Sequence, residues 1–244
     1  MASTTTATEA DQGIRTGELE LAGARLVLDP AGALWWPSER ALIVADLHLE
    51  KGSAFAARGV PLPPYDTRAT LAVLARLVER WAPRTILALG DSFHDRGAAG
   101  RLGAAERAGL AGLARGREMV WIAGNHDPEP MPGIAGMHAG ELRVGPLTLR
   151  HEPAEGSVRA GVDGEIAGHF HPVARLVVRG RSLRRRCFVT DGRRLVMPAL
   201  GAYAGGLNIR DAALAGLFAR ACEAHLIGAA RTYRIAHHAC LPDR

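Results

Sequence analysis

The feature that most constrains this chain is a recurring one: a short apolar segment that ends directly in side chains able to bind a metal. Apolar runs of this length are typical of buried strands, and the residues that follow such strands gather at the edge of a sheet. The segment Thr85–Leu89, for example, leads through Gly90 to Asp91. The segments 41–45 and 119–123 end in the same way. The three segments together deliver Asp46, His48, Asp91, Asn125, His126 and Asp127.

Further imidazoles follow later in the chain. His151 stands alone, whereas His169 and His171 belong to a GHFH sequence. We interpret Asp91 as a residue shared by two metal ions, because two close cations need a bridging carboxylate and neutral ligands around it. This donor set suits transition metals better than Mg²⁺ or Ca²⁺. Mn²⁺ is the first choice for the two divalent ions, with Fe²⁺ and Zn²⁺ as alternatives.

A pair of such ions is suited to the hydrolysis of phosphoesters. The reaction needs a nucleophile at neutral pH, charge neutralisation at the phosphoryl oxygens and a stabilised leaving group. Two cations about 3.5–4 Å apart supply all three, with a hydroxide that bridges the metals as the nucleophile.

Length and composition favour one globular domain. A chain of 244 residues fits a single large α/β domain, and a hydrophobic fraction of 48% is typical of globular proteins. We expect residues 1–13, which are polar and rich in Thr and Ala, to form a disordered tail and residues 14–244 to form the domain. No apolar run approaches the ~20 residues needed to cross a bilayer, so we expect no membrane association.

Charge and cysteine content give weaker indications of the binding partner and the cellular compartment. The formal net charge of +5 suggests a polyanionic partner, although Lys51 is the only lysine and the excess of arginine is also a compositional bias. The three cysteines are widely spaced and form no disulfide framework. A reducing cytoplasm is therefore the expected compartment.

Helices are expected early in the chain and strands late. Apolar spacing predicts helices over 66–81 and 104–115, and prolines predict a loop over the segment 49–65 that precedes the first of them. Short strands are expected at 142–144, 147–150, 165–167, 174–178, 187–190 and 194–197. A short helix near 212–221 and a hairpin over 225–235 complete the chain. This order is typical of a mixed sheet covered by helices.

The polar segments also match, in order, the motifs of a known superfamily. D-x-H, GD, GNHD, a single His and G-H-x-H run from Asp46 to His171, and together they resemble the calcineurin-like metallophosphoesterases. The resemblance implies an α/β fold, a four-layer α/β/β/α sandwich of two mixed sheets flanked by helices. It also implies a role for His126, which would contact the phosphoryl group and help to protonate the leaving oxygen. The ligands that it implies are Asp46, His48 and His171 for one ion, Asn125, His151 and His169 for the other, and Asp91 as the bridge.

Longer stretches narrow the resemblance to one bacterial branch. DLHLEKG from Asp46, LPPYDT from Leu62, GDSFHD from Gly90 and GHFHP from Gly168 are similar to the ligase-associated DNA-damage-response phosphoesterases, which are described as endonucleases. This similarity implies DNA as the substrate. It also implies a pathway shared with a DNA ligase, an exonuclease and a helicase.

One position departs from the protein phosphatases of the superfamily. They carry an acid three residues after the bridging Asp, where this chain has His94 and places Asp95 one residue further on. A His at this position resembles the double-strand-break repair nucleases, so we expect His94 to be catalytic and to assist cleavage of a phosphodiester, whose alkoxide is a poor leaving group.

Basic residues near the motifs are candidates for substrate contact. They are Lys51, Arg58 and Arg96. The arginine-rich stretch 179–186 lies between two predicted strands. It is either a solvated hairpin turn or a contact for a phosphate backbone.

Two other functions remain open from the sequence. A phosphomonoesterase or cyclic-nucleotide phosphodiesterase would use the same site on a small substrate. A non-catalytic scaffold on the same fold would differ in chemistry, and such relatives usually lose ligands, whereas every ligand position is filled here.

Overall fold

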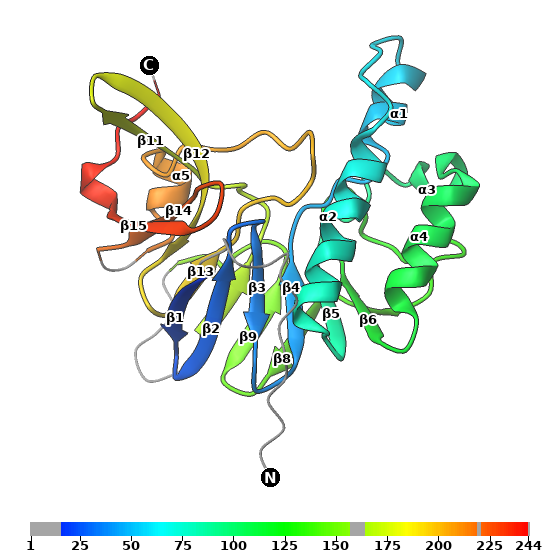
Figure 1. Cartoon of the computed structure of the whole chain (residues 1–244), viewed down its shortest axis with the longest axis horizontal. Helices are drawn as coiled ribbons and strands as arrows, with labels where there is room; N and C mark the ends of the chain where they lie inside the picture. The colour runs from blue at the N-terminus through cyan, green and yellow to red at the C-terminus, as the bar shows by residue number, and fades with distance from the viewer. Residues whose placement is uncertain (1–15, 157–163, 219–220, 244) are drawn as a thin grey trace.

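The computed structural model describes residues 16–156, 164–218 and 221–243, which form two β-sheets packed face to face (Figure 1). The tail expected over residues 1–13 lies outside the described residues. The assignment of residues 14–244 to a single domain stays a prediction.

The first sheet has seven strands in the order β1-β2-β3-β4-β5-β6-β7. Its first four strands pair antiparallel and its last four pair parallel, so the sheet is mixed. The strands are β1 (Gly17–Leu21), β2 (Ala24–Asp29), β3 (Ala33–Trp36), β4 (Ala41–Val44), β5 (Thr85–Leu89), β6 (Glu118–Ile122) and β7 (Met137–Ala139).

The second sheet follows the order β15-β14-β12-β13-β10-β9-β8, and β11 extends from it by pairing with β12. Strand β10 is parallel to both of its neighbours, while the remaining pairs are antiparallel. The strands are β8 (Glu141–Val144), β9 (Leu147–Arg150), β10 (Gly164–Ala167), β11 (Val173–Val178), β12 (Arg181–Thr190), β13 (Arg194–Val196), β14 (Glu223–Ile227) and β15 (Thr232–Ala236).

Three apolar cores hold the layers together. One lies between the sheets and contains Leu26, Ile43 and Phe188. A second lies between the first sheet and the helices that cover it, and a third lies on the outer face of the second sheet. The helices are α1 (Lys51–Ala57), α2 (Asp66–Trp81), α3 (Ala98–Arg101), α4 (Ala104–Ala114) and α5 (Ala212–Ala215).

This layering confirms the predicted α/β sandwich of two mixed sheets with helices. The two outer layers are unequal, however. Helix α2 turns Leu71, Leu74 and Leu77 toward the first sheet, in the spacing that the sequence predicts. The helical cover of the second sheet is α5, which has only four residues and contributes Leu214 to the third core.

Three local expectations are wrong. The segment expected as a loop contains α1, because residues 51–57 have no proline and the proline-rich part begins only at Pro61. Strand β7 lies within 128–140, a segment whose prolines and glycines predict a loop, since pairing with β6 rather than local propensity holds its three residues. In the arginine-rich stretch, only Arg179 and Gly180 form the turn, and the residues from Arg181 onward belong to β12.

The helices are short or amphipathic. Within the described ranges, none combines the length and apolar character that a membrane crossing requires.

Candidate metal centre

The seven predicted ligands lie at the carboxyl ends of five strands from both sheets. Strands β4, β5 and β6 of the first sheet lead to the ligands between residues 46 and 125, and β9 and β10 of the second sheet lead to those between 151 and 171. The sandwich therefore brings together residues that are up to 125 positions apart. Asp46, His48, Asp91 and His151 are buried, whereas Asn125 is exposed, so the site has a buried floor and an open rim.

The backbone at these positions is unusual. Five of the ligands have a positive φ, a conformation that sterically disfavours residues other than glycine. Such residues persist only where the surrounding structure fixes them, and they concentrate at functional sites. Here each lies in the sharp turn after a strand, and the turn directs its side chain into the site. The residues are Asp46 (φ 53°), His48 (φ 44°), Asp91 (φ 46°), His169 (φ 70°) and His171 (φ 47°).

Two glycines allow the turns to approach one another. Gly90 has a φ of 73°, and a Cβ atom there would lie 2.5 Å from the His151 ring. A Cβ atom on Gly124 would lie 2.2 Å from the backbone nitrogen of Asp91. Only glycine fits at either place, which explains why glycine directly precedes Asp91 and Asn125.

One group of ligand atoms is formed by Asp46, His48 and His171. The Nε2 atom of His171 lies 3.2 Å from Oδ1 of Asp46 and 3.3 Å from Nε2 of His48. These atoms are close enough to share one ion.

A second group is formed by Asn125, His151 and His169. The Oδ1 atom of Asn125 lies 2.9 Å from Nε2 of His151 and 3.0 Å from Nδ1 of His169, and the two imidazole nitrogens are 3.2 Å apart. Asp91 lies between the two groups: its Oδ2 atom is 3.4 Å from Nε2 of His151 and 4.0 Å from Nε2 of His48.

The chemistry of these donors fits divalent cations. The Nδ1 atom of His151 lies 2.9 Å from the carbonyl oxygen of Leu89 and donates its proton there, so a neutral ring directs the lone pair of Nε2 at the oxygen of Asn125. Lone pairs that face each other in this way need a cation or a proton between them.

The pKa values of two of these histidines are shifted in opposite directions. Although burial lowers the pKa of His151, its hydrogen bond with Asp91 and the charge of Asp46 raise that pKa to about 9. Burial and His171 lower the pKa of His48 to about 3, so its ring is neutral, which is the form in which histidine binds a metal.

Asp127 ties two of the ligand turns together, a role that the sequence did not reveal although the residue belongs to the GNHD motif. Its carboxylate accepts hydrogen bonds from the backbone N–H groups of Ser92, Phe93 and Gly124 at 2.8–3.1 Å. Burial raises its pKa to about 6. The turns after β5 and β6 are thereby held at a fixed separation.

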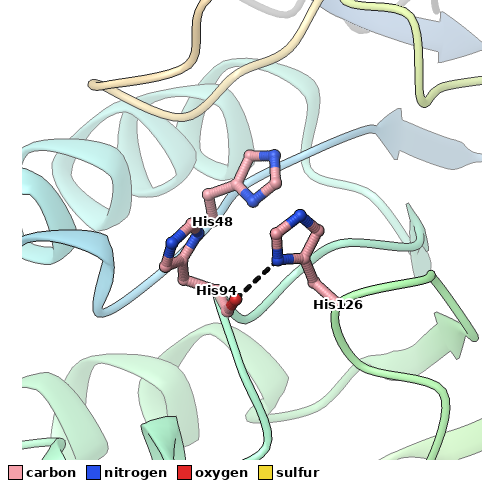
Figure 2. Close-up of side chains that lie close together, drawn as sticks. All are labelled: His48, His94 and His126. Carbon is pink, nitrogen blue, oxygen red and sulfur yellow. Dashed lines mark hydrogen bonds between the residues drawn. The ribbon is translucent and has the colours of Figure 1, made fainter. Parts of the chain in front are cut away.

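The two predicted catalytic histidines stack beside the ligand groups (Figure 2). Their ring centroids are 5.0 Å apart, and Nδ1 of His126 lies 2.7 Å from the carbonyl oxygen of His94. The Nε2 atom of His126 is 4.0 Å from Oδ2 of Asp91. Burial lowers the pKa of His94 to about 4. His94 is therefore a neutral imidazole, and the half-exposed ring of His126 faces the open rim.

Among the described residues, no side chain of the predicted substrate-binding residues makes a hydrogen bond or ion pair with a predicted ligand, although the backbone N–H of Lys51 donates to the carbonyl oxygen of His48 at 3.3 Å. Lys51 lies at the start of α1, with its Nζ atom 6.0 Å from the Phe55 ring. Arg58 is exposed just after α1. Arg96 is exposed and its Nη2 atom lies 4.0 Å from a carboxylate oxygen of Glu129. Their contact with substrate stays a prediction.

A polar network beneath α1 went unnoticed in the sequence. Arg101 donates to Ser53 at 2.9 Å and to Asp95 at 2.7 Å, and Ser53 in turn donates to Glu50 at 2.6 Å. No spacing in the sequence links these residues, because α1, the loop after Asp91 and α3 meet only in the folded chain. The network fixes α1 against the residue next to His94.

A buried ion pair supports the segment that follows His151. Arg194 is 1% exposed and its Nε atom donates to Glu165 at 2.5 Å. The same guanidinium donates to the carbonyl oxygens of Ala154, Gly156 and Leu217 at 2.6–2.9 Å. The sequence offered no signal for this pair, since both residues occupy ordinary strand positions.

Comparison with known proteins identifies the family of this chain. The sequence profile of the family described as calcineurin-like phosphoesterase matches residues 39–156. Among solved structures, the nuclease MPE of Pseudomonas putida is 32% identical in sequence; the match covers 91% of this chain and 100% of that one, with a TM-score of 0.69. Vacuolar Protein Sorting 29 of Cryptosporidium parvum is 15% identical, over 80% of this chain and 95% of its own, with a TM-score of 0.32. A search of the curated protein sequences gave no match.

Proposed function

Since the chain belongs to the calcineurin-like phosphoesterase family and is a metal-dependent phosphoesterase, we propose that it cleaves phosphodiester bonds in DNA as an endonuclease. The observation that carries this proposal is the convergence of two groups of ligand atoms on the shared Asp91, with His126 at the open side. The similarity to a nuclease supports nucleic acid as the substrate class.

In this proposal the two ligand groups, together with Asp91, would hold two divalent ions, with Mn²⁺ preferred for the donor set. When bound, such ions activate water and neutralise charge on the phosphoryl oxygens. The protein's own contribution is the rigid placement of the donors. Strained turns and the hydrogen bonds of Asp127 fix the donors before any substrate arrives.

His126 acts on the leaving oxygen. Its Nδ1–H group is engaged by the carbonyl of His94, so Nε2 is the atom that exchanges a proton with the substrate. Nε2 lies 4.0 Å from Oδ2 of Asp91, so this side of the ring faces the predicted ligand groups. A protonated His126 therefore transfers its Nε2 proton to the departing alkoxide.

His94 favours a diester over a monoester. The ring is buried and neutral, so, unlike an acid at this position, it adds no negative charge next to the substrate. A diester carries one charge and has a poor leaving group, for which a second imidazole beside His126 is useful. Lys51 and Arg58, which lie on and just after α1, are the basic residues that we assign to substrate binding, together with Arg96.

The biological setting follows the resemblance in sequence. We propose that the enzyme acts in the DNA damage response in the cytoplasm, in a pathway with a DNA ligase, an exonuclease and a helicase. The competing function is that of a phosphomonoesterase or cyclic-nucleotide phosphodiesterase, which would use the same donors. A scaffold without activity is disfavoured because such relatives usually lose ligands, whereas all seven ligand positions carry donors in this chain.

The test is a substrate panel with Asp91→Asn as the matched variant. With added Mn²⁺, the wild-type enzyme should hydrolyse bis-p-nitrophenyl phosphate and nick DNA. The variant should lose about 10²-fold or more of both activities, together with bound metal measured by elemental analysis. Full activity in the variant would contradict the proposal that Asp91 belongs to a catalytic metal centre. Hydrolysis of p-nitrophenyl phosphate or a cyclic nucleotide without cleavage of DNA would favour the competing function.

A further inference from the structure

The β11–β12 hairpin grows out of the loop that carries two of the predicted ligands. Strand β11 begins two residues after His171, and the N–H group of Cys187 closes the base of the hairpin by donating to the carbonyl of Pro172 at 3.0 Å. The two strands pair from Val173 opposite Arg186 to Val178 opposite Arg181. Figure 1 shows the hairpin extending beyond the body of the second sheet.

The hairpin carries positive charge and no negative charge. Residues 173–186 include six arginines and no acid. The arginines near the base have partners: Arg175 and Arg184 bind the C-terminal segment, and Arg186 donates to the carbonyl of Ala199. At the tip the situation differs. Residues 177–182 are all exposed, and within the described chain the guanidinium groups of Arg179 and Arg181 make no hydrogen bond or ion pair.

The turn at the tip uses a residue that its backbone disfavours. Arg179 and Gly180 have φ values of 50° and 75°. Positive φ at both central residues is the mark of a two-residue hairpin turn that prefers Asn-Gly or Gly-Gly. An arginine in the first position is therefore not explained by the turn. Residues held in such conformations concentrate where a side chain has a function.

We infer that this hairpin is a nucleic-acid contact arm, whose tip arginines bind phosphates of the DNA strand beyond the bond that is cleaved. The inference rests on the proposed function for its substrate. Five residue steps of β11 at about 3.3 Å each place the tip about 17 Å from the base of the hairpin, a distance that spans several nucleotides. Contacts of this kind are independent of base sequence, because Arg binds the phosphate group itself.

The experiment uses the double variant Arg179→Asn with Arg181→Ser in the full chain. Asparagine suits the positive φ of the turn, so the melting temperature should stay the same or rise. Binding of a fluorescein-labelled DNA oligonucleotide, measured by anisotropy in EDTA to prevent cleavage, should weaken about tenfold at 0.1 M salt. The slope of log K against log[salt] should become shallower by about 1.5, since two phosphate contacts are lost.

The matched control removes two exposed arginines from the helical side, Arg76→Ser with Arg115→Ser. It changes the net charge equally and should leave the affinity and the slope near those of the wild type. Hydrolysis of bis-p-nitrophenyl phosphate should stay within twofold of the wild type in both variants, because so small a substrate does not reach the tip.

The outcomes separate the two proposals. Equal DNA affinity in the hairpin variant and the control overturns the contact arm, as does a wild-type enzyme that hydrolyses the small diester but does not bind DNA. A hairpin-dependent affinity for DNA in an enzyme that cleaves no phosphodiester would support the contact arm and overturn the proposed function.

Discussion

The Nδ1 atom of His126 lies 2.7 Å from the carbonyl oxygen of His94. The backbone of one histidine thus orients the ring of the other, while the two rings stack at 5.0 Å (Figure 2). Position 94 consequently has two separable parts: a carbonyl that any residue supplies and an imidazole that only histidine supplies.

Substitution of the two histidines should therefore have unequal effects. His126→Asn removes the proton donor, and we expect kcat for bis-p-nitrophenyl phosphate to fall about 10²–10⁴-fold. His94→Ala keeps the carbonyl, so the loss should be smaller, about 10-fold or more. Metal content, measured by elemental analysis, should be unchanged in both. The exposed His238 provides a control, since His238→Ala should retain full activity. A larger loss in His94→Ala than in His126→Asn would contradict this order.

Gly90→Ala should damage the metal centre through a steric clash. The new Cβ atom would lie 2.5–2.6 Å from atoms of the His151 ring, at a φ of 73°. We expect a loss of about 2–4 kcal/mol in the free energy of unfolding and weaker binding of one of the two ions, measured by urea denaturation and metal titration. Gly116→Ala is the matched control, because Gly116 has a φ of 69° with nothing within 4 Å. Equal losses of stability and metal binding in the two variants would show that the positive φ alone, and not the clash with His151, causes the effect.

Removing the charge of one partner in the buried ion pair of Arg194 and Glu165 should strongly lower the free energy of unfolding. Glu165→Gln leaves the guanidinium uncompensated, and we expect the free energy of unfolding to fall by about 3–5 kcal/mol. Replacing both, as in Glu165→Leu with Arg194→Met, should recover part of this loss. Urea denaturation of Glu165→Leu, Arg194→Met and their double variant measures the coupling. Strictly additive losses would mean that the pair contributes only through separate contacts.

The ion pair of Asp95 and Arg101 gives a dependence on pH. Burial opposes the charge of Asp95, but the hydrogen bond and charge of Arg101 lower its pKa below the ordinary 3.8. A lowered pKa stabilises the fold above pH 3.8, and the stabilisation is lost as the pH falls through the folded-state pKa. Arg101→Met should cost about 1 kcal/mol at pH 7. The difference in melting temperature from the wild type should shrink below pH 4, and a constant difference down to pH 2 would contradict this prediction.

The metal-binding residues were more predictable from the sequence than the residues that hold them in place, and the reason is physical. Each ligand is encoded locally: a short apolar strand, a sharp turn and a donor stand within a few residues, as in the segment from Thr85 to Asp91. The order of such segments predicted a mixed sheet covered by helices with the donors at strand ends, and the resemblance to a known superfamily implied the sandwich of two sheets. Contacts between distant segments have no local signature, so the pair of Arg194 and Glu165 could not be predicted from the sequence.

Helix α1 and strand β12 illustrate a second limit. The prolines after Gly59 dominated the interpretation of the segment before α2, although α1 ends at Ala57 before they begin. In β12 a run of arginines looked like a loop, yet pairing with β11 makes most of it a strand. In both places, tertiary pairing and packing decided the structure over local composition.

The candidate metal centre straddles the two sheets. Asp46 follows β4 in the first sheet and His171 follows β10 in the second, with 3.2 Å between their donor atoms. An ion held there acts as a removable cross-link between the halves of the sandwich, in addition to any chemistry that it supports. Chelation should then lower the cooperativity of unfolding as well as the rate of hydrolysis. The stability of the sandwich and the activity of the enzyme would thus both depend on the metal supply.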